Sequence, residues 1–217
     1  RSVPVEELLS YDAVFLGTGA GLPYFMGIEG ENLPGIYSAN EFLTRVNLMG
    51  AQNFPIFDTP VKRGKKVVVI GGGNVAMDAA RVAKRMGSDV TLMYRRTEAD
   101  MPARLDEVRG VEAIKMEIGE PGEDGRSSIK EIEGSNFIVE ADVVVEAIGQ
   151  GPNPLLLRMM PDLARNRNGS VTVNEVGQTS IAKVYAGGDV ATGAATVILA
   201  MGTAKDAARA IDAQLRA

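Results

Sequence analysis

Residues 65–94, KKVVVIGGGNVAMDAARVAKRMGSDVTLMY, decide the fold of this chain. The β-branched run at 65–70 predicts a strand buried on both faces of a parallel sheet. Residues 74–86 predict a helix ended by a glycine, with apolar side chains on one face at Val75, Ala79, Val82, Ala83 and Met86. Residues 90–94 predict a second strand, so the stretch is a strand–helix–strand unit of an α/β fold.

The glycines between the first strand and the helix match the dinucleotide-binding pattern G-x-G-x-x-G/A. Gly71 permits the tight turn, Gly73 lets the backbone approach a pyrophosphate, and Ala76 lets helix and strand pack closely. The helix N-terminus offers free N–H groups and its positive dipole end to the phosphates. A structural glycine turn is the alternative, but the strand before and the helix after favour a dinucleotide site. The expected contacts are Gly71, Gly72, Gly73, Asn74, Val75 and Ala76.

The end of the second strand indicates which dinucleotide binds. In NAD sites an Asp or Glu usually stands there and binds the ribose 2′-OH. This chain has Arg95 and Arg96 instead. Guanidinium groups suit the 2′-phosphate of NADP, which accepts paired hydrogen bonds. A solvated basic turn is the alternative, but we expect NADP(H), with a preference over NAD of about tenfold or more.

Composition excludes several classes of chemistry on this segment. The 217 residues contain no Cys and no His, and the net charge is −5. These residues therefore supply no Ser-His-Asp triad, Cys–His pair, redox dithiol, common zinc site or Cys-ligated iron–sulfur cluster. Nothing indicates nucleic-acid affinity, and no apolar run approaches the roughly 20 residues of a membrane helix. We expect a cytoplasmic protein in which a bound cofactor carries any redox chemistry.

Three further segments run from an apolar strand into a small-residue turn: residues 12–20, 141–149 and 184–189. Such turns are typical of strands that end beside a nucleotide, although a plain buried strand and turn is the alternative. Asp189 is a solvated loop carboxylate, a helix-start residue or a partner for a ribityl or ribose hydroxyl. A helix is predicted after it, with apolar residues at Val197, Met201, Ala204, Ala208, Ile211 and Leu215.

These segments together resemble the flavoproteins with two dinucleotide-binding domains. The likeness is strongest to the family of the small (β) chain of NADPH-dependent glutamate synthase and the large subunit of NADH-dependent ferredoxin:NADP oxidoreductase. The resembling stretches follow the family's order at residues 12–47, 67–87, 94–104, 141–156 and 184–211. The resemblance implies an NADPH-dependent oxidoreductase that passes hydride to FAD. Electrons would continue to iron–sulfur clusters, which lie on missing segments or on a partner of the large (α) glutamate-synthase or ferredoxin type. A homodimer is left open.

The resemblance also implies a division of the chain. A Rossmann-like NAD(P)-binding domain, residues 47–150, would be inserted in an incomplete FAD-binding domain, residues 1–46 and 151–217. The residues implied to lie near FAD are Thr18, Gly19, Ala20, Gly187, Gly188, Asp189, Thr196 and Val197. Those implied to lie near the nicotinamide are Gly149, Gln150 and Gly151.

Three departures from the family lead us to expect a fragment of a longer chain. The family's Cys-rich segment and the FAD domain's own glycine fingerprint are missing. The middle is too short for a crossover helix, so we expect absent residues near Glu107–Val108. Residues 114–118 and 136–139 predict antiparallel strands around a solvated loop at 119–126. The fragment should bind NADPH but hold FAD poorly and be inactive alone. A non-catalytic NAD(P)-binding or assembly module is the alternative, whereas the lack of Cys contradicts a disulfide reductase of the thioredoxin-reductase kind.

Overall fold

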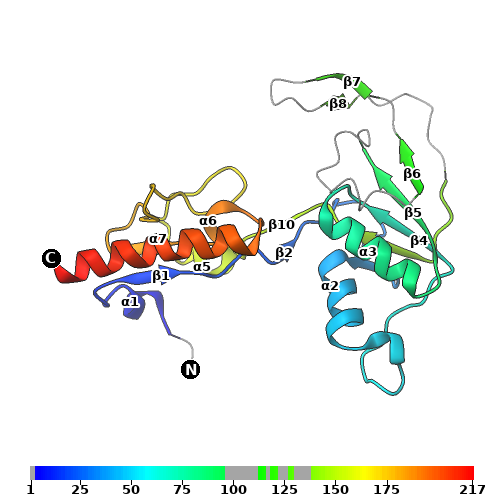
Figure 1. Ribbon diagram of the computed structural model, residues 1–217, viewed down its shortest axis with the longest axis horizontal. Helices are drawn as coiled ribbons and strands as arrows, with labels where there is room; N and C mark the ends of the chain where they lie inside the picture. The colour runs from blue at the N-terminus through cyan, green and yellow to red at the C-terminus, as the bar shows by residue number, and fades with distance from the viewer. Residues whose placement is uncertain (1–2, 96–111, 116–117, 122–126, 130–137) are drawn as a thin grey trace. The chain divides into compact units, whose positions relative to one another are not determined.

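The computed structural model describes residues 3–95, 112–115, 118–121, 127–129 and 138–217. The chain forms two compact units (Figure 1). We call residues 1–24 with 149–217 the split unit, and residues 25–148 the continuous unit. Residues 25–46, which the family resemblance assigns to the flavin flank, pack here within the continuous unit.

A five-stranded parallel sheet forms the centre of the continuous unit. Its order is β3 (Ile36–Ser38), β9 (Val143–Glu146), β4 (Lys66–Ile70), β5 (Asp89–Tyr94) and β6 (Glu112–Lys115). All neighbouring strands are parallel. The register pairs Ile70 with Met93 on one side and with Glu146 on the other. The carboxyl ends of β9, β4 and β5 therefore meet at one edge, where open α/β sheets bind their ligands. The predicted α/β class with a parallel sheet is confirmed.

Helices α3 (Asn74–Arg85) and α2 (Ala39–Leu43) complete the main core (Figure 1). A π-helical turn, η1 (Thr44–Leu48), and a 3₁₀ turn, η2 (Ala51–Asn53), continue the chain from α2. The apolar face of α3 differs from the predicted one at its start, because Val75 is 37% exposed. The residues of α3 that are buried are Ala76, Met77, Ala79, Ala80, Val82 and Ala83. Small side chains on this face let the helix approach the β-branched strand closely.

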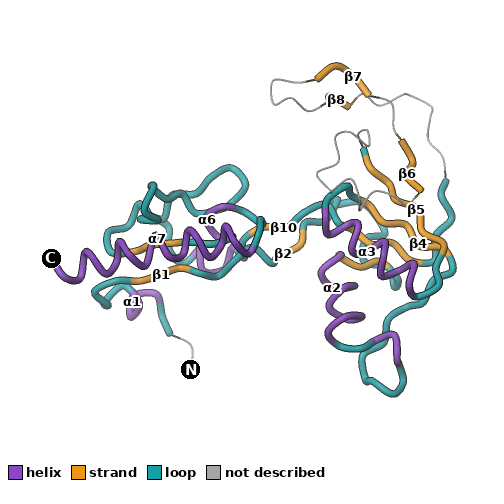
Figure 2. The backbone as a smooth tube through the Cα atoms, in the orientation of Figure 1, coloured by secondary structure: helices purple, strands orange, loops and turns teal. Residues whose placement is uncertain are grey.

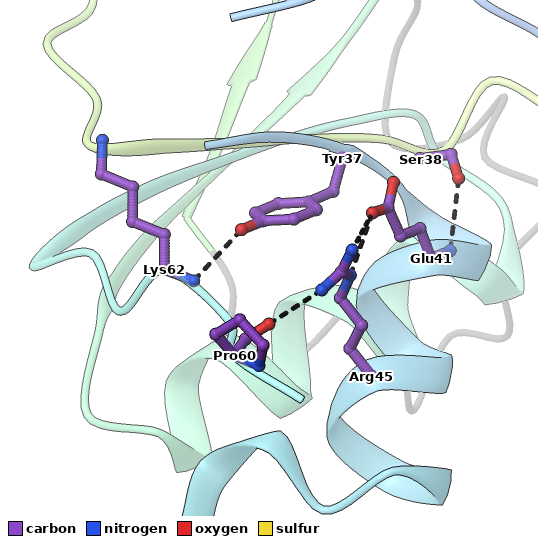
Figure 3. A network of polar contacts seen from close by, with 6 residues as sticks. All are labelled: Tyr37, Ser38, Glu41, Arg45, Pro60 and Lys62. Atoms are coloured by element: carbon purple, nitrogen blue, oxygen red, sulfur yellow. Dashed lines mark hydrogen bonds and ion pairs between the residues drawn. The ribbon is translucent and has the colours of Figure 1, made fainter. Parts of the chain in front are cut away.

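Side chains from β3 and η1 fix the segment that leads into β4 (Figure 3). Arg45 donates hydrogen bonds to a Glu41 carboxylate oxygen and to the Pro60 carbonyl oxygen, each at 2.9 Å. The Lys62 backbone N–H donates to the Tyr37 hydroxyl at 3.1 Å. The Arg45 guanidinium also lies 5.8 Å from the centroid of the Tyr37 ring. Residues 60–62 are thereby held at defined points against η1 and β3.

The strands that follow β5 in the sequence differ from the predicted ones. Residues 112–115 form β6, which joins the parallel sheet, and β7 (Ile118–Pro121) pairs antiparallel with β8 (Ser127–Ile129). The single strand predicted at 114–118 is therefore wrong, and residues 119–121 of the loop predicted at 119–126 belong to β7. Residues 116–117 and 122–126 lie outside the described residues. Of the strand predicted at 136–139, residues 138 and 139 are not in a strand, and Ile138 is 94% exposed. Residues 136–137 and Glu107–Val108 lie outside the described residues.

The split unit is built from the two ends of the chain. Strand β1 (Val14–Leu16) pairs parallel with β11 (Val184–Ala186), and β2 (Leu22–Pro23) pairs antiparallel with β10 (Gln150–Gly151). Its helices are α1 (Val5–Leu8), α5 (Pro154–Arg158), α6 (Asp189–Thr192) and α7 (Val197–Arg216). The core contains Val5, Leu16, Leu157, Met160, Leu163, Val171, Val184, Ala186 and Val190. Both ends of the chain thus contribute to one apolar cluster.

Helix α7 is the long helix that ends the chain (Figure 2). It packs through the small residues Ala204 and Ala207, of which only Ala204 belongs to the predicted apolar stripe. A Cβ at Gly187 would lie 3.0 Å from the Ala204 backbone, and one at Gly177 would lie 2.8 Å from the Ala207 Cβ. By contrast, Val197 is 75% exposed. Because Gly177 and Gly187 face alanines, α7 lies very close to the backbone at these glycines. The larger side chains of α7 therefore lie beside this contact and not within it. Among the described helices, none is both long and apolar enough to cross a bilayer.

Candidate cofactor-binding sites

The glycine turn after β4 is closely packed against its neighbours. Gly71 has φ +138°, and a Cβ there would lie 2.3 Å from the Ala147 carbonyl oxygen. A Cβ on Gly72 would lie 2.7 Å from ring carbons of Tyr94. Only glycine satisfies both the conformation and the space at Gly71. The turn therefore passes between the ends of β9 and β5 with its backbone bare of side chains.

The helix that follows begins without a side-chain cap. Gly73 is the N-cap residue of α3, and the Met77 N–H donates back to the Gly73 carbonyl oxygen at 3.2 Å. The N–H groups of the first turn have no intrahelical acceptor. Asn74 and Val75 are exposed there, and Ala76 is fully buried. An exposed helix start after a glycine turn fits the pyrophosphate of a dinucleotide.

Arg95 follows the last residue of β5, one strand away from the glycine turn. Its side chain is exposed, and the Gly71 N–H donates to the Met93 carbonyl oxygen at 2.9 Å, so strand and turn are joined at this edge. Arg95 is thus on the strand that carries the 2′-selective residue in dinucleotide sites. Arg96 lies outside the described residues.

A buried carboxyl group at the same edge of the sheet was not predicted from the sequence. Glu146, the last residue of β9, is 3% exposed, and its Oε2 has no hydrogen-bond partner among the described residues. The pKa of Glu146 is raised to about 7, mainly by burial. The negative charge of Glu31 and a hydrogen bond with Glu31 raise it further. Glu31 is itself held by the Gly27 N–H, which donates to its two oxygens at 2.9 and 3.1 Å. The signal in the sequence was a Glu inside the apolar run Val-Val-Val-Glu-Ala-Ile.

The split unit contains a pocket of about 410 Å³ between the ends of β1 and β11 and the start of α7. Six of the residues expected near FAD line it: Gly19, Gly187, Gly188, Asp189, Thr196 and Val197. Phe15, Ala200 and Met201 supply apolar wall. Thr18 and Ala20 are not among its lining residues: Thr18 is exposed and Ala20 is 5% exposed. The structure therefore brings residues 15–19 together with residues 187–204, from which they are far apart in the sequence.

Polar groups of this pocket are arranged around Gly188. Its φ is +71°, and its N–H donates to Thr203 Oγ1 at 2.8 Å. The adjacent Asp189 has one carboxylate oxygen, Oδ1, that is buried without a hydrogen-bond partner among the described residues. Leaving a buried acceptor unpaired costs about 1–3 kcal/mol. A ligand hydroxyl that donates to Asp189 would remove this cost, which fits the ribityl chain of a flavin.

The start of α7 has a cap of its own. Thr196 Oγ1 accepts a hydrogen bond from the Leu199 N–H at 3.3 Å. Val197, Ile198 and Met201 are 75%, 83% and 52% exposed. Apolar side chains beside a pocket suit a planar ring, and burying each such side chain fully is worth about 1.5–3 kcal/mol.

The segment expected beside the nicotinamide belongs to the split unit. Gly149 has φ +120°, and Gln150 and Gly151 form β10 against β2. The Tyr24 hydroxyl would lie 2.3 Å from a Cβ on Gly151, and the Tyr24 N–H donates to the Gly149 carbonyl oxygen at 3.0 Å. Tyr24 therefore covers these glycines in the structure. Their position beside a nicotinamide stays a prediction.

A family model and several curated relatives match most of this chain. The family model "Pyridine nucleotide-disulphide oxidoreductase" matches residues 2–210. The glutamate synthase [NADPH] small chain of Halomonas elongata is 34% identical over 97% of this chain and 52% of its own length. The NADP(+)-dependent formate dehydrogenase subunit beta of Moorella thermoacetica is 35% identical over 95% of this chain and 32% of its own. The chain thus spans about a third to a half of these relatives.

Solved structures agree on the fold. The thioredoxin reductase of T. acidophilum superposes with a TM-score of 0.70, at 22% identity, covering 94% of this chain and 66% of that chain. The family model and the curated relatives confirm the resemblance to the glutamate synthase small chain and its oxidoreductase relatives, and this chain belongs to the pyridine nucleotide-disulphide oxidoreductase family.

Proposed function

We propose that this chain is the NADPH-binding part, with adjoining flavin-binding segments, of a flavoprotein oxidoreductase. The glycine turn at Gly71–Gly73, with the uncapped start of α3, carries the proposal. The N–H groups of the first turn of α3 would hold the pyrophosphate, and Arg95 and Arg96 would bind the 2′-phosphate of NADPH. The continuous unit would be the nicotinamide-binding part, and the split unit the flavin-binding part.

The flavin-binding segments would hold FAD through Asp189, the glycine backbone before it and the apolar start of α7. Asp189 would accept a hydrogen bond from the ribityl chain, and the bare Gly187–Gly188 backbone would let that chain approach. Val197 and Met201 would pack against the ring. FAD, when bound, supplies the acceptor for the hydride of NADPH. The protein's own task is to position both groups and exclude water, so no side-chain acid or base is required.

The finer assignment concerns the electron acceptor. We propose a separate electron-transfer partner of the large glutamate-synthase or ferredoxin type that carries iron–sulfur clusters. The names of two relatives support a partner, since they denote a "small chain" and a "subunit beta". The absence of Cys from these 217 residues places any cluster with Cys ligands elsewhere.

Isothermal titration of the purified chain with NADPH and with NADH tests the proposal. NADPH should bind about tenfold or more tightly than NADH, because a charged hydrogen bond contributes about 1.5–3 kcal/mol. Arg95→Gln with Arg96→Gln should remove this preference and leave NADH binding unchanged. Arg209→Gln is the matched control, because Arg209 is an exposed arginine of α7 in the other unit. Equal affinity for the two dinucleotides in the unaltered chain, or no binding, would contradict the proposal.

A further inference from the structure

The continuous unit contains a second cavity, of about 380 Å³, at the far end of α3 from the glycine turn. The residues that line it include Val46, Asn47, Gln52, Arg63, Arg85 and Met86. Arg85 is the last residue of α3, whereas the glycine turn precedes the first. A helix of this length spans about 18 Å. The cavity is therefore separate from the edge of the sheet at which a dinucleotide would bind.

The lining of this cavity has a distinct chemistry. Arg63 and Arg85 supply two guanidinium groups, and Asn47 and Gln52 supply carboxamides, while the described lining includes no carboxylate. Neither arginine has an ion pair with any residue that the structure describes. The apolar floor belongs to the main core, where Val46 and Val82 are 5% and 7% exposed. Within the described part of the chain, the site thus combines two arginines that have no ion-pair partner with an apolar surface.

The two arginines are held on segments that are joined to each other. The Ser88 hydroxyl, three residues after Arg85, donates to the Gly64 carbonyl oxygen at 2.7 Å. On the other side of Arg63, the Lys62 N–H is bound by the Tyr37 hydroxyl (Figure 3). The Arg63 guanidinium also donates to the Gln52 carbonyl oxygen. Little backbone freedom remains to be lost when a ligand binds, and such preorganisation favours affinity.

We propose that this cavity binds a small organic dianion with an apolar body, such as a dicarboxylate or a phosphate monoester. Two like charges that share one pocket repel each other, and an anion between them replaces repulsion with attraction. The planar fork of each guanidinium matches the paired oxygens of a carboxylate or a phosphate. The floor at Val46 and Val82 accepts the apolar part, and the volume lies within the range of small-molecule sites. This binding is independent of the proposed NADPH site.

Isothermal titration with glutarate and with phenyl phosphate tests the inference and separates the two kinds of anion. Sodium chloride at matched ionic strength and the monoanion butyrate are the comparison ligands. We expect saturable binding of at least one dianion, weakened as salt is raised. Arg63→Gln and Arg85→Gln should each weaken binding about tenfold or more. Arg209→Gln should leave it unchanged.

A second measurement makes each outcome decisive. NADPH titration of the same two variants should give the affinity of the unaltered chain, which shows that the variants are folded. Absence of dianion binding to the unaltered chain at millimolar concentration would overturn the inference, as would binding that survives both substitutions. Loss of NADPH binding with intact dianion binding would count against the proposed function alone.

Discussion

The buried carboxyl of Glu146 predicts that stability falls between pH 5 and pH 8. Its pKa is raised to about 7 from 4.5, through burial and the nearby Glu31. Below pH 4.5 the folded and unfolded states both carry the proton, and stability is unaffected. Between pH 4.5 and 7 the unfolded chain releases this proton while the folded chain keeps it, so folding becomes less favourable as pH rises. The full difference corresponds to about 3 kcal/mol above pH 7.

Urea unfolding at pH 5, 6, 7 and 8 measures this loss of stability. Hydrogen exchange of the β9 amides at the same pH values measures it in the strand that carries Glu146. Glu146→Gln keeps the shape of the side chain without the titrating group, so its stability should vary much less over this range. Glu140→Gln is the control. Glu140 is exposed and Lys66 lowers its pKa, so any contribution of Glu140 to stability changes only at acidic pH. If the unaltered chain and Glu146→Gln show the same dependence between pH 5 and 8, the reasoning is refuted.

Three further outcomes follow from the same structure. Gly71→Ala should lower stability by at least about 1–3 kcal/mol and abolish NADPH binding. The reason is that residue 71 has a positive φ and lies beside a backbone carbonyl group. Gly72→Ala should cost less, because the Tyr94 ring can move, and urea titration of both variants checks the order. Asp189→Ala should raise the midpoint of thermal unfolding of the ligand-free chain, because a buried unpaired oxygen is removed, yet weaken FAD binding measured by flavin fluorescence; a lowered midpoint would contradict this. Asp142→Asn should lower the midpoint, because its carboxylate accepts from the Lys65 and Lys66 N–H groups at 2.8 and 3.0 Å, and the loss should be greatest at neutral pH.

Local patterns predicted the elements that local forces decide. The strand at 65–70, the helix at 74–86 and the strand at 90–94 match β4, α3 and β5 to within one residue at each end. The β-branched composition of the short strands, the glycines that bound them and the amphipathic period of the helix together distinguish strand from helix here. The glycine turn was equally readable, since the positive φ of Gly71 and its contact with Ala147 allow no side chain.

Non-local packing explains what the sequence did not reveal. The face of α7 that is buried is decided by glycines at 177 and 187, which lie far from the helix in sequence and let Ala204 and Ala207 make the contact. The role of residues 25–46 depends on β3 pairing with β9, about a hundred residues later. Glu146 appeared to be one more member of a buried strand, and only the approach of Glu31 shows it as half of a carboxyl pair. Each of these features depends on a contact with a residue that is distant in the sequence, and the spacing of hydrophobic residues does not identify that residue.

The order of the chain suggests how the split unit becomes stable. Its parallel pair β1–β11 joins residues near opposite ends of the chain, and closing so long a loop costs conformational entropy that grows with loop length. The continuous unit lies wholly within that loop and has its own core. Once it is folded, the parallel pairing of β3 with β9 fixes the distance between the segment that leads from Tyr24 into β3 and the segment that leads from β9 to Gly149, which leave the pair at opposite ends. The remaining loop is then effectively short, and the pairing of β2 with β10 follows directly. We therefore expect substitutions in β9 and β4 to weaken both units, whereas substitutions in α7 should weaken the split unit alone.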